Sequence, residues 1–137
     1  MNQSQPIFPS WMRGILLVSA VYNIAWGLFV YNFTESFVKW ITNSVTVSTY
    51  QIELHGLGLF MLGFIFIISA IQPIRFWYFI AFGFLAKAFG GIWVYFSVMR
   101  QTFTSQFILH LFINDYIWAV LLGIIAWKAF KIYRHVD

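Results

Sequence analysis

Six strongly polar side chains interrupt the apolar stretches of this sequence and are its candidates for chemistry. They are Asn23, Glu53, His55, Lys87, Asn114 and Asp115. Carboxyl, imidazole and amino groups can transfer protons, and together with amides they can orient the polar head of a bound molecule. Burying such groups in a bilayer costs several kcal/mol, so they are expected to face the interior of a helical bundle and to mark a functional site.

Each polar group shares a helical face with small residues. The four sets are Ser19, Asn23 and Gly27; Glu53, Gly56, Gly63 and Ala70; Gly83, Lys87 and Gly91; and Asp115, Ala119 and Gly123. Small residues mark close helix–helix contact in membranes. Four helices are therefore predicted to turn their polar residues toward one shared interior.

The depths of these residues predict a pocket. Counted from the outer ends of the helices, Asn23 and Asp115 lie about eight residues in and Lys87 about twelve, a difference in height of only ~6 Å. We expect a ligand-binding pocket with Lys87 at its floor that opens to the outer face. Three side chains lie nearer that face: Glu53, His55 and His110.

Several of these residues also admit structural interpretations. Lys87 and Asp115 could form an ion pair that fixes helix register, or Lys87 could lose its proton and act as a base or bind an anion. Glu53 lies close enough to the surface to be solvated. His55 lies about 200° around the helix from Glu53, so both cannot point squarely inward.

Two further features concern ligands. His55 and His110 enter from the same side at similar depth, but no recognised haem or metal spacing supports a metal there, and none is predicted. His110 alone is typical of an interfacial histidine. Trp118, one turn beyond Asn114, could stack on a ligand or cation, or simply pack. The sequence identifies no cofactor.

The composition places the chain in a membrane. Hydrophobic residues make up 61% and charged residues 9%, against about 25% charged in soluble domains. The absence of cysteine excludes disulfides, iron–sulfur clusters and thiol catalysis. The net charge of +4 comes from residues mostly at the ends of apolar segments, which argues for membrane anchoring and against nucleic-acid binding.

The apolar segments predict one all-α membrane domain over residues 1–137. Its four transmembrane helices are expected over residues 14–31, 52–71, 76–99 and 107–130. Pro73 closes the second span and makes a tight hairpin with the third. Ser10 is a predicted N-cap, and Val18-Ser19-Ala20, although it resembles a cleavage site, is expected to lie within an uncleaved first span.

The loop over residues 32–50 predicts a short amphipathic helix at the membrane surface. Asn32 and Glu35 have the spacing of a capping box, and Ser48 and Gln51 offer a second one for the next helix. The apolar face of the short helix would carry Phe33, Phe37, Trp40 and Ile41.

The distribution of basic residues predicts the orientation. Five lie on one side of the expected bundle and two on the other: Arg13, Arg75, Lys128, Lys131 and Arg134 against Lys39 and Arg100. The positive-inside rule then places both termini in the cytoplasm.

Four segments together resemble a known family. Tyr22-Asn23 with Trp26-Gly27, His55-Gly56, Ala86-Lys87-Ala88-Phe89-Gly90, and Asn114-Asp115 with Trp118 are similar to segments of small four-helix bacterial integral membrane proteins of the DoxX-like kind. The resemblance extends over most of the chain. It implies a four-helix bundle in a bacterial inner membrane and transfers no catalytic residues.

Three functions follow as hypotheses. The first is a bundle that binds a small, partly apolar molecule (a quinone, an isoprenoid or a membrane lipid) or a partner membrane subunit. The second is an enzyme on such a substrate, with Lys87, Asp115, Glu53 or His55 transferring protons. The third is an ion or proton conduit, which would require a homo-oligomer because four helices make too thin a bundle for a wide pore.

Overall fold

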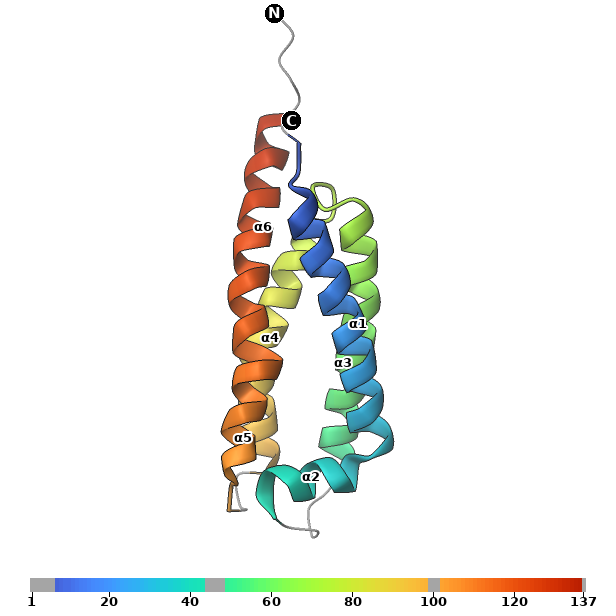
Figure 1. Cartoon of the computed structure of the whole chain (residues 1–137), viewed down its shortest axis with the longest axis vertical. Helices are drawn as coiled ribbons and strands as arrows, with labels where there is room; N and C mark the ends of the chain where they lie inside the picture. The colour runs from blue at the N-terminus through green and yellow to red at the C-terminus, as the bar shows by residue number, and fades with distance from the viewer. Residues whose placement is uncertain (1–6, 44–48, 99–101, 137) are drawn as a thin grey trace, which may run out of the picture.

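The computed structural model describes residues 7–43, 49–98 and 102–136 and shows an elongated helical bundle (Figure 1). Its elements are α1 (Ser10–Asn32), α2 (Thr34–Thr42), α3 (Tyr50–Ile71), α4 (Trp77–Val98), α5 (Ser105–His110), a π-helical segment η1 (Leu111–Tyr116) and α6 (Ile117–Val136). Four helices are long and apolar enough to cross a membrane: α1, α3, α4 and the continuous α5–η1–α6 helix. The predicted four-helix architecture is confirmed.

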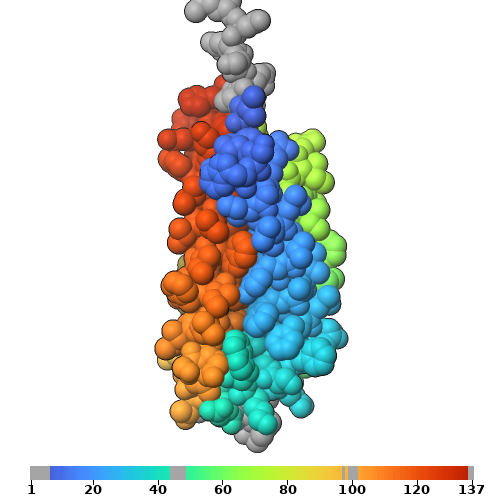
Figure 2. All heavy atoms as spheres, in the orientation of Figure 1, coloured from blue at the N-terminus to red at the C-terminus, as the bar shows by residue number. Residues whose placement is uncertain are grey.

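The long helices associate as two pairs. α1 packs along α3, and α4 packs along α6, while the short turn at residues 72–76 joins α3 to α4 as an antiparallel hairpin. Side chains of α1 and α6 meet on the face shown in Figure 2. The predicted hairpin at Pro73 is confirmed, since α3 ends at Ile71.

Glycines bring α1 and α3 into backbone contact. A Cβ added to Gly56 would lie 2.7 Å from the backbone nitrogen of Tyr31, and one added to Gly27 would collide with the backbone of Phe60. Small residues allow this approach, as the spacing of Gly27 and Gly56 predicts.

The helix α2 lies across the end of the bundle opposite the termini (Figure 1). It buries Phe37, Val38 and Ile41 against α1, α3 and α5 residues. Thr104, at the start of the last span, donates from its backbone nitrogen to Ile41 O at 2.8 Å. The apolar face of α2 therefore rests largely on protein.

Helix starts differ from the predicted caps. Pro9, in extended conformation, precedes α1, so Ser10 is already helical. The capping box at Asn32 and Glu35 is wrong because α1 runs through Asn32, whose Nδ2 donates to Leu28 O at 2.8 Å. Phe33 precedes α2 without a side-chain cap. The cap at Ser48, the end of the third span at residue 99, and Arg100 lie outside the described residues.

Candidate functional site

A widened helical turn places two polar residues in the bundle interior. Asn114 and Asp115 lie in η1, and each is about 1% exposed. Consecutive residues in a regular α-helix diverge by roughly 100°, whereas a π-turn inserts one extra residue into the helix and is frequent at functional sites. In this protein both side chains face α4.

Lys87 of α4 meets this pair and is fully buried. Its Nζ lies 3.5 Å from Asn114 Oδ1, to which it donates, and 3.9 Å from Asp115 Oδ1. Asn114 Nδ2 in turn donates to Asp115 Oδ1 at 3.0 Å. The three side chains form a closed network, which we call the Lys87 triad, and the ion pair anticipated from the sequence is present.

Aromatic rings of α1 and α6 lie beside the triad. The Tyr22 ring centroid is 6.0 Å from Lys87 Nζ and 5.3 Å from the ring of Trp118. A ring face at this distance attracts an ammonium group. Trp118 therefore packs on Tyr22, which is itself in cation–π range of the lysine.

Asn23 is buried on α1 and is satisfied mainly by its own helix. Its Nδ2 donates to the backbone oxygen of Ser19 at 2.7 Å, while its Oδ1 has no hydrogen-bond partner among the described residues. The structure records no bond between Asn23 and the triad.

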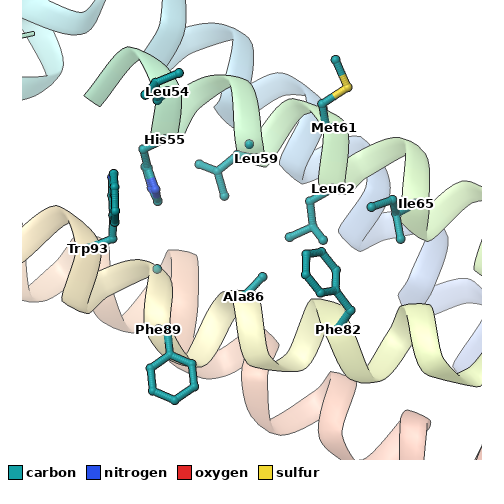
Figure 3. Close-up of a pocket in the computed structure, with 12 residues that line it drawn as sticks. Leu54, His55, Leu59, Met61, Leu62, Ile65, Phe82, Ala86, Phe89 and Trp93 are labelled. Carbon is teal, nitrogen blue, oxygen red and sulfur yellow. The ribbon is translucent and has the colours of Figure 1, made fainter. Parts of the chain in front are cut away.

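A cleft of about 560 Å³ lies between α3 and α4 (Figure 3). Its wall is almost entirely apolar, with aromatic rings at the rim. The lining residues on α3 are Leu54, His55, Gly58, Leu59, Met61, Leu62 and Ile65, and those on α4 are Phe82, Ala86, Phe89, Gly90 and Trp93. Since Met61, Phe89 and Trp93 are half or more exposed on helices long and apolar enough to cross a membrane, the cleft opens sideways, away from the bundle axis.

His55 is the polar residue of this cleft. It reaches from α3 toward α4 beside Trp93 (Figure 3), and its Nε2 is buried without a hydrogen-bond partner among the described residues. Buried polar atoms in proteins are almost always paired, so an unpaired one calls for an explanation. A bound molecule can supply the missing partner.

Gly90 separates the cleft from the Lys87 triad. A Cβ at this position would lie 3.6 Å from His55 Cε1 and 3.4 Å from Asp115 Oδ1. The side chains of His55 and Asp115 therefore both approach the position that a side chain of residue 90 would occupy. Because this residue is glycine, that position is free. The second carboxylate oxygen of Asp115, Oδ2, has no hydrogen-bond partner among the described residues.

His110 lies inside a cage of aromatic rings. Trp26 stacks on it with centroids 5.9 Å apart, and Phe37 and Trp40 meet it edge-on at 5.0 and 6.4 Å. The residue is 2% exposed, and neither ring nitrogen has a hydrogen-bond partner in the described part of the chain. Rings of α1 and α2 therefore enclose His110 within the protein.

Glu53 lies apart from the other candidates. It borders a polar hollow at the α1–α2 corner, with Asn32, Thr34, Glu35 and Thr49. The structure thus divides the predicted site into four places: the triad with Trp118 nearby, His55 in the cleft, Asn23 on α1, and Glu53 at the end of the bundle.

Three contributors to this arrangement were not among the predicted site residues: Tyr22, Gly58 and Gly90. Tyr22 and Gly90 belong to the segments that carry the family resemblance, but neither has a charge that marks it. Gly58 differs from the packing glycines in that an added Cβ would meet nothing within 4 Å. Within the described residues, no three His, Cys, Asp or Glu side chains converge as a metal site would require.

Comparisons with known protein families, with curated proteins and with solved structures gave no match.

Proposed function

We propose that this chain is an integral membrane protein that holds a small lipophilic molecule in the cleft between α3 and α4. The ligand class is a quinone, an isoprenoid or another lipid with a compact polar head. The observation that carries the proposal is His55, whose Nε2 lies unpaired in an otherwise apolar, lipid-facing cleft.

The cleft suits such a molecule in size and lining. A volume of about 560 Å³ lies within the range of roughly 300–1,000 Å³ typical of small-molecule sites. Trp93, which stands beside His55 (Figure 3), offers a ring face to a planar head or an unsaturated tail. A lateral opening admits a molecule that is already dissolved in the bilayer.

The polar head is fixed by His55. A neutral imidazole nitrogen either donates or accepts one hydrogen bond, according to its tautomer, and so suits a carbonyl or hydroxyl oxygen. Because Gly90 carries no side chain, a head bound at His55 also approaches Asp115 Oδ1. The ligand would thus bridge the cleft and the Lys87 triad.

A second candidate function is proton transfer to or from the bound head. It is favoured by Asp115 Oδ2, which is buried without a partner among the described residues. A carboxyl group within reach of a ligand oxygen can act as a general acid or base. Under this alternative Asp115→Asn combined with Lys87→Met, which removes both charges of the pair, would leave binding intact and stop the conversion of the bound molecule.

The proposal includes a location. The protein would lie in a bacterial inner membrane with both termini cytoplasmic and with α2 at the outer surface. His55, in the first two turns of α3, would then lie in the outer leaflet, and the cleft would extend from there toward the middle of the membrane.

Native mass spectrometry of the full chain, released from membranes in mild detergent, tests the proposal. The wild-type protein should carry a defined additional mass. Gly58→Leu should remove it by filling the cleft, because an added side chain meets open space there. Gly14→Leu is the matched control, since Gly14 on α1 also faces open space but lies outside the cleft.

His55→Leu separates recognition of the head from filling of the cleft. It should reduce occupancy about tenfold, the effect of losing roughly 1.4 kcal/mol of hydrogen bonding. An empty wild-type protein of clear stoichiometry, or equal loss of the added mass in Gly58→Leu and Gly14→Leu, would exclude ligand binding in this cleft. Binding of a partner membrane subunit would then be the remaining function.

A further inference from the structure

A second hollow, unrelated to the α3–α4 cleft, lies at the end of the bundle that carries the termini. It has a volume of about 400 Å³ and is formed where α1, the α3–α4 turn and α6 converge. Its lining comprises Arg13, Ile71, Gln72, Pro73, Ile74, Arg75 and Tyr133. Two arginines on separate elements thus line one depression.

The arginines are held in place without a carboxylate. Arg13 donates from an Nη to Ile71 O at 3.2 Å, at the carboxyl end of α3. The Arg75 guanidinium lies 5.5 Å from the ring of Phe76. Among the described residues neither arginine forms an ion pair, and no Asp or Glu lines the hollow. Each guanidinium keeps donors for an incoming anion.

The surroundings of the hollow match the headgroup level of a membrane. Lys131 lies over Trp127 at 5.4 Å, and Arg134 over Phe130 at 5.7 Å. Basic and aromatic residues at the end of membrane-spanning helices are typical of the interface between lipid and water. Ile71, which lines the hollow, is 65% exposed and adds an apolar surface to it.

We infer that this hollow binds the phosphate of an anionic glycerophospholipid. Arginine recognises phosphate through paired N–H donors in a planar fork, and two such groups from different elements would grip one headgroup from two sides. Ile71 and Ile74 then face the first carbons of the acyl chains. The site would fasten the α3–α4 turn to α1 and to the carboxyl end of α6 at the membrane surface.

The test is retention of phosphatidylglycerol by the full chain in native mass spectrometry, with phosphatidylcholine and inorganic phosphate as competing arms. The wild-type protein should retain phosphatidylglycerol preferentially. Arg13→Gln with Arg75→Gln should weaken this binding at least tenfold, the effect of losing about one charge-assisted hydrogen bond. The matched control is Lys128→Gln with Lys131→Gln, which removes the same charge from exposed residues of α6 outside the hollow.

The remaining variants distinguish a specific phosphate site from nonspecific electrostatic attraction between a basic protein and an anionic lipid. Arg13→Lys with Arg75→Lys keeps the charge but removes the fork, and should bind more weakly than wild type while folding normally. Equal losses in the arginine and lysine double variants would overturn the site, because net charge alone would explain binding. Preference for free phosphate over the lipid, or equal retention of phosphatidylcholine, would overturn it as well.

Discussion

Lys87 is buried where α4, η1 and α1 meet, and its surroundings explain how the interior of an apolar helical bundle can hold an ammonium group. The amide oxygen of Asn114 lies closer to Nζ than the carboxylate of Asp115 does, at 3.5 against 3.9 Å. The amide therefore accepts the hydrogen bond while the carboxylate balances the charge. Tyr22 adds a ring face 6.0 Å away.

Removing one charge of this pair should destabilise the protein more than removing both. Lys87→Met leaves the Asp115 carboxylate buried without its cation, and Asp115→Asn leaves the ammonium without its anion. Each single change should lower the free energy of unfolding by about 3–5 kcal/mol, and the double variant by less than the larger single loss. Denaturation in mixed micelles, followed by circular dichroism, measures all four proteins.

One outcome of the double-mutant cycle would contradict the ion pair. Losses that simply add would show that the two side chains do not interact. The control cycle pairs Lys87→Met with Glu53→Gln, because Glu53 lies in a separate hollow at the α1–α2 corner. That cycle should be additive.

At the level of helices, the glycines fall into two groups: some face a neighbouring helix at close range, and others face open space. Gly27 and Gly56 let the backbones of α1 and α3 touch, whereas Gly58, two positions further along α3, borders the cleft, and a Cβ added there would meet nothing within 4 Å. The same residue type therefore serves both in a close backbone contact and beside an open cleft. Composition alone does not distinguish these roles.

Gly27→Ala should weaken the α1–α3 interface. The new methyl group would collide with the backbone at Phe60, and overpacking of this kind costs about 1–3 kcal/mol. Gly14→Ala on the same helix meets no neighbour and should be neutral or stabilising by up to about 1 kcal/mol, through helix propensity. Thermal unfolding in detergent compares the two, and equal stability would contradict backbone contact at Gly27.

The π-helical segment η1 is the element that sequence periodicity could not predict. Helical spacing assigns Asp115, Ala119 and Gly123 to one packing face, and Asp115 and Ala119 are indeed buried. The same spacing turns Asn114 away by about 100°. The widened turn restores it to the interior, and nothing in the local residue types marks where such a turn will form.

For the whole molecule, the features predicted correctly from the sequence were those with the strongest physical constraint on residue type. Long apolar runs and Pro73 were sufficient to predict four spans and a hairpin. A helix that crosses a bilayer needs about 20 consecutive apolar residues, so such spans are easy to recognise in a sequence. Which helices pair was not predictable, since every span carries a small-residue face. The sequence predicted one pocket for all candidate residues. It did not predict that α2 covers His110 or that Gly90 lies between the cleft and the Lys87 triad.

The arrangement of basic residues allows a direct test of orientation for the whole chain. Arg13, Arg75 and the basic residues of α6 lie at the end with the termini, and Lys39 lies on α2 at the opposite end (Figure 1). The positive-inside rule then predicts cytoplasmic termini and an outer α2. Since the chain contains no cysteine, single cysteines can report this without background.

Ser36→Cys on α2 and Ser10→Cys at the start of α1 make a matched pair, because both serines are exposed. In intact spheroplasts a membrane-impermeant maleimide should label the Ser36→Cys protein and leave the Ser10→Cys protein unlabelled until the membrane is permeabilised. The reverse pattern would place α2 in the cytoplasm. It would also move the His55 end of the cleft to the inner leaflet and the arginine hollow to the outer one, so the ligand of each would have to come from the opposite leaflet.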